Sequence, residues 1–126
     1  MTLVLDAGAL VAAERGKRDI LALLKHELIE RRAPVTHGGV IGQVWRGGSG
    51  KQALLARLMP ALLVAPLDDE LGRRAGILLG RANRSDVVDA ALVLLASDGD
   101  SILTSDVRDL TPLAHHAGVH VDIVAV

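Results

Sequence analysis

The sequence has no cysteine, no phenylalanine and no tyrosine, and its only tryptophan is Trp45. The absence of cysteine excludes disulfides and thiolate metal sites, and it fits a reducing compartment, so we expect a cytoplasmic protein. Since half of the 126 residues are hydrophobic, the chain can still build a sizeable core, but only from Leu, Val, Ala and Ile. A single Trp also excludes the aromatic stacking surface of many single-strand-binding proteins.

An excess of charge of one sign is also lacking, because 14 Lys and Arg balance 15 Asp and Glu. The net charge of −1 gives no global attraction to nucleic acid, so such contacts require a local basic patch. Basic residues gather in the middle of the chain, where Arg46, Lys51 and Arg84 are candidates to bind phosphates; solvated helix faces are the alternative. Apolar runs such as "LMPALLVAPL" are too short to span a bilayer, so we expect no membrane association.

Short apolar runs alternate with longer helical patterns along the whole chain. This alternation predicts a single α/β domain, 1–126, in which helices cover both faces of a central parallel sheet of four to five strands. The expected strands are 3–5, 33–36, 62–67, 101–105 and 120–125. The expected helices are 7–14, 18–31, 38–46, 50–59, 68–82, 86–97 and 108–116. In the second helix, one apolar stripe is expected to contain Ile20, Leu21, Leu24, Leu28 and Ile29.

Two aspartates follow predicted strands. Asp6 comes directly after "LVL", and Asp106 follows the strand "SILTS". Ligands of open parallel sheets bind beyond the carboxyl ends of the strands, so the two carboxylates meet there if these strands are neighbours. Each Asp alone is equally explained as a helix N-cap.

A second acidic pair, Asp86 and Asp89, stands in "SDVVDAALVLLA". The spacing of three places both residues on one face of the first helical turn, where capping and the helix dipole also explain them. Clustered carboxylates raise one another's pKa unless a cation neutralises them. Mg²⁺ or Mn²⁺ is the natural cation for oxygen ligands, and such a site assists hydrolysis of phosphate esters.

With these residues in place, the chain resembles the PIN-domain ribonucleases, specifically VapC toxins of bacterial toxin–antitoxin pairs. The resemblance rests on "LVLDAGALVAAE" at the start, "QVWRGG" at 43–48, "SDVVDAALV" at 85–93 and "ILTSDVRDL" at 102–110. It implies a PIN-like three-layer α/β/α fold, a Mg²⁺- or Mn²⁺-dependent endoribonuclease, an RNA substrate, a cognate antitoxin and a homodimer.

Carried over by position, the resemblance assigns Asp6, Asp89 and Asp106 as catalytic and metal-binding acids. It adds Asp86 as a further metal ligand and Asp109 as an accessory residue that acts through a water. The departure from the family lies at Gln43, where a Glu is usual. An amide offers a carbonyl oxygen but no charge, which leaves open single-metal catalysis, a substitute role for Asp86 or an impaired nuclease.

Two rival functions remain open from the sequence. The first is a non-catalytic module that binds RNA or protein, and Gln43 is the residue that favours it. The second is a receiver-like phospho-acceptor domain, which is disfavoured because no Lys follows a later strand. Metal-stimulated RNA cleavage separates ribonuclease activity from both rivals.

Overall fold

The computed structural model describes all residues, 1–126, and contains five strands and seven α-helices. The strands are β1 (Leu3–Leu5), β2 (Val35–His37), β3 (Leu63–Ala65), β4 (Ser101–Thr104) and β5 (Asp122–Ala125). The helices are α1 (Ala7–Glu14), α2 (Arg18–Ile29), α3 (Gly38–Val44), α4 (Ala53–Leu58), α5 (Asp69–Ala82), α6 (Val87–Leu94) and α7 (Val107–Ala117), and two 3-10 helices are η1 (Gly50–Gln52) and η2 (Met59–Ala61).

The strands form one sheet in the order β3-β2-β1-β4-β5, and every pair is parallel. This confirms the predicted parallel sheet. The two strands that precede Asp6 and Asp106 are neighbours, since Leu5 of β1 pairs with Leu103 of β4. Asp6 and Asp106 therefore both lie at the carboxyl edge of the sheet, beyond the ends of two neighbouring strands.

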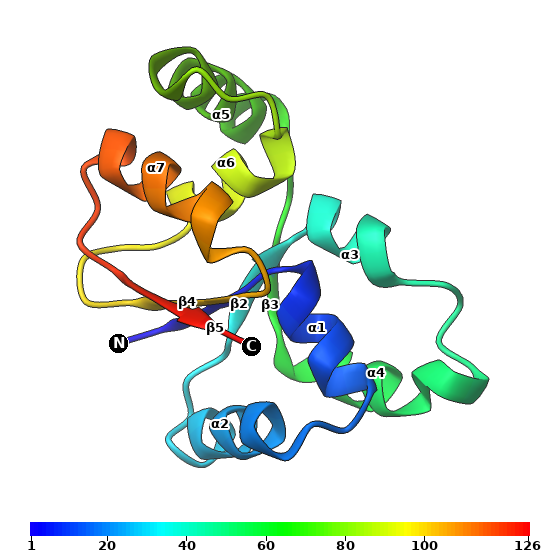
Figure 1. The fold of residues 1–126 in the computed structure, drawn as a ribbon. Helices are drawn as coiled ribbons and strands as arrows, with labels where there is room; N and C mark the ends of the chain where they lie inside the picture. The colour runs from blue at the N-terminus through cyan, green and yellow to red at the C-terminus, as the bar shows by residue number, and fades with distance from the viewer.

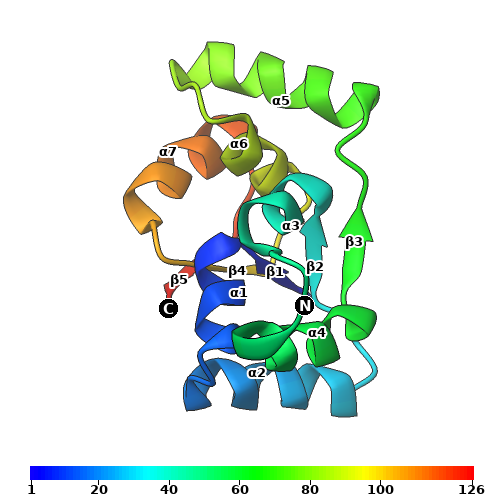
Figure 2. The same ribbon diagram turned by 90° about the vertical axis from the view of Figure 1, so that its right-hand side faces the viewer.

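Helices cover both faces of the sheet, which gives the predicted three layers. Figure 1 shows α5, α6 and α7 on one side and α1, α2 and α4 on the other, and the quarter turn in Figure 2 shows the same arrangement. The helix α3 lies beside α1, beyond the end of β2. None of the helices combines the length and apolar character that crossing a membrane requires.

The core is a single cluster of 25 buried Leu, Val, Ala and Ile residues. All three residues of β1 are buried, and so are Ile102, Leu103 and Thr104 of β4. Continuous apolar runs are expected of strands that are covered on both faces. Each fully buried Leu or Ile contributes about 1.5–3 kcal/mol, which compensates for the missing aromatic rings.

The predicted apolar stripe of α2 is only partly correct. Ile20 and Leu24 are buried, but Leu28 is 43% and Ile29 68% exposed. The last turn instead buries Glu27, whose Oε2 accepts a hydrogen bond from Arg32 Nε at 2.6 Å. The helix ends at Ile29, so the chain turns back and brings Arg32 to the buried carboxylate.

The glycine-rich segment after α3 is a turn, as predicted, and it shortens the helices on both sides. α3 ends at Val44 because Trp45 is extended, with ψ 128°. Gly48 has a φ of +77°, and a Cβ at this position would overlap the Trp45 ring. The predicted helix 50–59 begins as a 3-10 turn, where the Gln52 side chain accepts from the backbone N–H groups of Arg46 and Gly48.

Candidate functional site

Three helices begin on an aspartate at the carboxyl edge of the sheet. Asp6, Asp86 and Asp106 are the N-caps of α1, α6 and α7, and their Oδ1 atoms accept from the backbone N–H three residues later at 2.9, 3.0 and 3.3 Å. The capping interpretation is thus confirmed for all three. A carboxylate has about four lone-pair sites, so a cap leaves capacity for a further ligand.

The capping aspartates line one pocket of about 180 Å³. The pocket has no Lys, Arg or His in its wall. Its polar residues are Asp6, Gln43, Asp86, Asp89, Ser105, Asp106 and Asp109. The structure therefore brings together every acid that the sequence singled out, and it does so from β1, β4 and two helices that are distant in sequence.

The crowding of carboxylates perturbs their protonation. Burial, followed by the negative charges of Asp86, Asp6, Asp106 and Asp109, raises the pKa of Asp89 to about 6. The pKa of Asp109 is also raised, first by its hydrogen bond with Asp106 and then by the charge of that residue. The pocket is therefore a site of unbalanced negative charge, where a cation would be stabilised.

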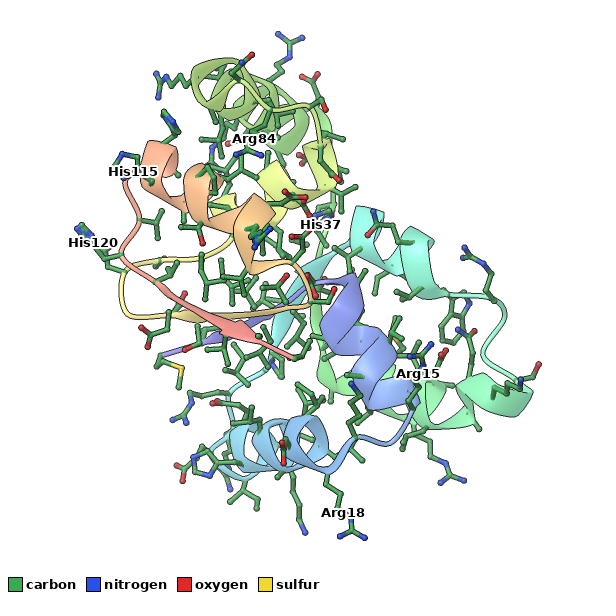
Figure 3. The ribbon with its side chains drawn as sticks, viewed as in Figure 1. Arg15, Arg18, His37, Arg84, His115 and His120 are labelled. Atoms are coloured by element: carbon green, nitrogen blue, oxygen red, sulfur yellow. The ribbon has the colours of Figure 1, made fainter.

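One positively charged side chain, that of Arg84, lies beside the pocket. Arg84 lines an adjoining hollow of about 120 Å³ together with Asp86, Asp89 and Asp109, and its Nη1 lies 3.8 Å from Asp109 Oδ1. Both side chains of this pair are about half exposed, so the pair neutralises the rim of the pocket rather than its interior. Figure 3 shows Arg84 on the same side of the sheet as α6 and α7.

Thr104 joins the two strand-end aspartates, and sequence reasoning missed this role. Its hydroxyl donates a short hydrogen bond to Asp6 Oδ2 and accepts from the backbone N–H of Asp106 at 2.8 Å. Thr104 is fully buried, so these bonds fix the position of Asp6 against β4. The available signal was a polar residue at the end of a buried strand, two residues before an acid.

His37 is a second residue that the sequence did not reveal. It ends β2, as Asp6 follows β1, and its Nδ1 accepts from the backbone N–H of Gly39 at 3.0 Å. Nε2 lies 2.9 Å from the carbonyl oxygen of Val88, so it carries the proton and donates. Burial lowers the pKa of His37, which keeps the ring neutral. Its hydrogen bond to Val88 holds the first turn of α6, next to Asp89, against β2 (Figure 3).

Gln43 lies on α3, where the resemblance places it. It is exposed and lines both the carboxylate pocket and the groove beside it. No acidic residue of α3 replaces it, because the helix sequence is GGVIGQV. Asp86 supplies a carboxylate to the same pocket from α6.

No group of three or more His, Cys, Asp or Glu side chains is already arranged around a single point as metal ligands. In each of Asp6, Asp86 and Asp106, one carboxylate oxygen accepts the capping hydrogen bond of a helix N-terminus. The chemistry of the donors nevertheless fits a hard divalent cation, because the pocket offers carboxylate and amide oxygens and no sulfur or imidazole.

Two of the predicted phosphate-binding residues lie away from the pocket. Arg46 Nη1 donates to the carbonyl oxygens of Gly42 and Trp45, at 3.2 and 2.7 Å, and Lys51 is in η1. Neither residue lines the carboxylate pocket or the neighbouring groove. Of the three, only Arg84 adjoins the acidic residues.

No model of a known protein family matches this sequence, and comparison with curated proteins finds no significant match.

Proposed function

We propose that the protein is a metal-dependent endoribonuclease of the PIN-domain class. The observation that carries this proposal is the pocket at the carboxyl ends of β1 and β4, which five aspartates line and no Lys, Arg or His lines. Structural capping requires one oxygen per helix, but it does not require three capped helices to converge. A shared function in cation binding accounts for the convergence.

Asp6, Asp89 and Asp106 would hold the cation, with Asp86 as a further ligand and Gln43 and Asp109 at the periphery. A bound Mg²⁺ or Mn²⁺ would polarise a phosphodiester and lower the pKa of a bound water. The residues of the chain orient these ligands. Thr104 keeps Asp6 against β4, and His37 holds the first turn of α6, which carries Asp89.

The raised pKa of Asp89 also supports the proposal. Unbalanced charge costs stability, and perturbed carboxylates gather at functional sites because the ligand supplies the missing charge. A cation in the pocket would return Asp89 to its ionised form. We therefore expect cation binding to release a proton near pH 6.

The biological role that accompanies this activity is that of a toxin, inhibited by a cognate antitoxin. We propose that the antitoxin places an arginine among the carboxylates, because a guanidinium pairs with a carboxylate bidentately and replaces the charge of the metal. A homodimer and a cytoplasmic location belong to the same proposal. A complex in which the antitoxin never approaches Asp6 or Asp106 would refute this mode of inhibition.

RNA cleavage by the purified protein tests the activity. We expect cleavage with Mn²⁺ or Mg²⁺, none with EDTA, and none in Asp6→Asn, which keeps the capping oxygen but loses the charge. Asp122→Asn is the matched control, since Asp122 is exposed on β5, outside the pocket. Equal cleavage by Asp6→Asn and the control would exclude the assigned site.

The alternative is a non-catalytic module that binds RNA or protein through the same pocket. Gln43 favours it, because an amide in place of an acid leaves one negative charge fewer for a second metal. Absence of cleavage at any metal concentration, together with retained binding of RNA, would select this alternative.

A further inference from the structure

A groove of about 390 Å³ continues the carboxylate pocket along α1. Its only charged side chains are those of Arg15 and Lys17, and Val126, the last residue of the sequence, also lines it. The two hollows share the residues Ala7, Gly8, Gln43 and Ser105. A pocket whose charged side chains are all acidic therefore adjoins a groove whose two charged side chains are both basic.

The basic end lies at the opposite end of α1 from the aspartates. α1 begins after Asp6 and ends at Glu14, so its eight residues span about 12 Å. Figure 3 shows Arg15 at this far end, with Arg18 beyond it at the start of α2. Lys17 also lines the next cavity along the surface, together with Arg18.

These cations are free to bind a ligand. Arg15 and Lys17 are exposed, and neither takes part in any of the three ion pairs of the protein. No side-chain hydrogen bond engages them either. Their charge is thus not used to stabilise a neighbouring carboxylate.

The passage between pocket and groove is built from small side chains. Ala7, Gly8 and Ser105 form it, and a Cβ on Gly8 would overlap the Ser105 side chain. Glycine at this position lets β4 and α1 approach closely. The longer side chain of Gln43, which is exposed, also lines both hollows.

We propose that this groove binds the sugar–phosphate backbone of single-stranded RNA next to the scissile phosphodiester, with Arg15 and Lys17 contacting phosphates. The proposal rests on the proposed function, which places one phosphodiester at the carboxylates. The carboxylates repel the other phosphates, so attraction has to come from cations further along the strand. Because Trp45 is the only aromatic side chain of the Phe, Tyr and Trp kind and lines neither the pocket nor the groove, we expect phosphate contacts to carry most of the affinity.

Binding without catalysis tests the groove independently of cleavage. A fluorescein-labelled single-stranded oligouridylate is titrated with the full chain in EDTA at several salt concentrations. Arg15→Gln/Lys17→Gln removes two charges and keeps long side chains. Lys25→Gln/Arg74→Gln is the matched control, because both residues are exposed, make no ion pair and lie outside the groove.

We expect the groove variant to bind more weakly and to reduce the slope of log K against log salt by about 1.4, since each phosphate contact on a single strand contributes about 0.7. The control variant should bind like the wild type. Arg15→Lys/Lys17→Arg keeps both positive charges and should show the same slope as the wild type. If the two residues had a purely structural role, the slope would not depend on their charge. Circular dichroism verifies that each variant folds.

The outcomes separate this proposal from the proposed function. An unchanged slope in the groove variant overturns the RNA groove even if the wild type cleaves RNA. A reduced slope supports the groove even if no metal induces cleavage, which would refute only the nuclease. Absence of oligouridylate binding by the wild type overturns the groove outright.

Discussion

At the scale of a single residue, Asp89 shows how the carboxylate pocket changes the pKa of a side chain that lines it. Burial and four neighbouring carboxylates raise its pKa from 3.8 to about 6. Because the folded-state pKa lies above the unfolded value, the folded protein holds an additional proton between about pH 4 and pH 6. The contribution of Asp89 to stability is therefore present below about pH 4 and is lost as the pH rises toward 6.

We predict that Asp89→Asn raises the free energy of unfolding at pH 7 and changes it little at pH 4. The change in pKa corresponds to at most about 3 kcal/mol. Since the side chain is only half-buried, solvent screening reduces the expected gain to about 1 kcal/mol. Urea unfolding in EDTA at both pH values measures it.

Asp122→Asn is again the control, because its carboxylate lies outside the pocket. It should give the same stability as the wild type at both pH values. A gain in Asp89→Asn of equal size at pH 4 and pH 7 would mean that charge repulsion in the pocket is not its cause.

At the scale of elements, α2 is held by one buried ion pair as well as by apolar contacts. The carboxylate of Glu27 is 3% exposed and pairs with Arg32, which is 39% exposed. The pair joins the last turn of α2 to the segment that leads into β2. Removal of the Arg32 side chain alone would leave the buried carboxylate of Glu27 without its partner.

We predict that Arg32→Ala lowers the free energy of unfolding by about 1–3 kcal/mol, the cost of an unsatisfied buried group. Glu27→Leu/Arg32→Ala should recover much of this loss, because no charge is then buried. Thermal and urea unfolding of both variants provide the measurement.

Arg73→Ala is the matched control for this pair. It removes an arginine from an ion pair with Asp69 at 2.9 Å, but both side chains are about four-fifths exposed. Its effect should not exceed about 0.5 kcal/mol. Equal losses in Arg32→Ala and Arg73→Ala would show that burial of Glu27 does not matter.

At the scale of the whole molecule, the pocket exists only in the folded state. Its acids come from the ends of β1 and β4 and from the starts of α6 and α7, so unfolding disperses them. A cation that binds them therefore stabilises the fold by mass action, by about 2.7 kcal/mol at a concentration one hundred times its Kd.

We predict that Gln43→Glu binds Mn²⁺ more tightly than the wild type, by about 1–3 kcal/mol for a charged in place of a neutral ligand. The wild type should hold one metal weakly and cleave better with Mn²⁺ than with Mg²⁺. Calorimetric titration of both proteins with Mn²⁺ measures affinity and stoichiometry.

Ala22→Glu serves as the control, since it adds one acid on an exposed position of α2, away from the pocket. It should bind Mn²⁺ like the wild type. If Gln43→Glu also does so, Gln43 lies outside the metal shell.

The sequence alone determined the layered architecture of the protein. Continuous apolar runs such as Leu3–Leu5 require cover on both faces, and their alternation with helical periodicity leaves a parallel sheet as the solution. The position of Asp6 and Asp106 just beyond the ends of strands was also readable, because parallel strands end at one edge. Helix ends were less accurate, since α3 and α6 stop at local turns that the apolar pattern does not report.

Only the tertiary structure decided how the acids are held and what surrounds them. The bonds of Thr104 and His37 join residues 98 and 51 positions apart, and no local pattern encodes such contacts. The groove that contains Arg15 and Lys17 forms only because α3, Ser105 and Val126 pack beside α1, while Arg46 and Lys51 lie on a turn outside both hollows. Spacing in sequence reveals which residues share an element, but packing decides which elements share a site.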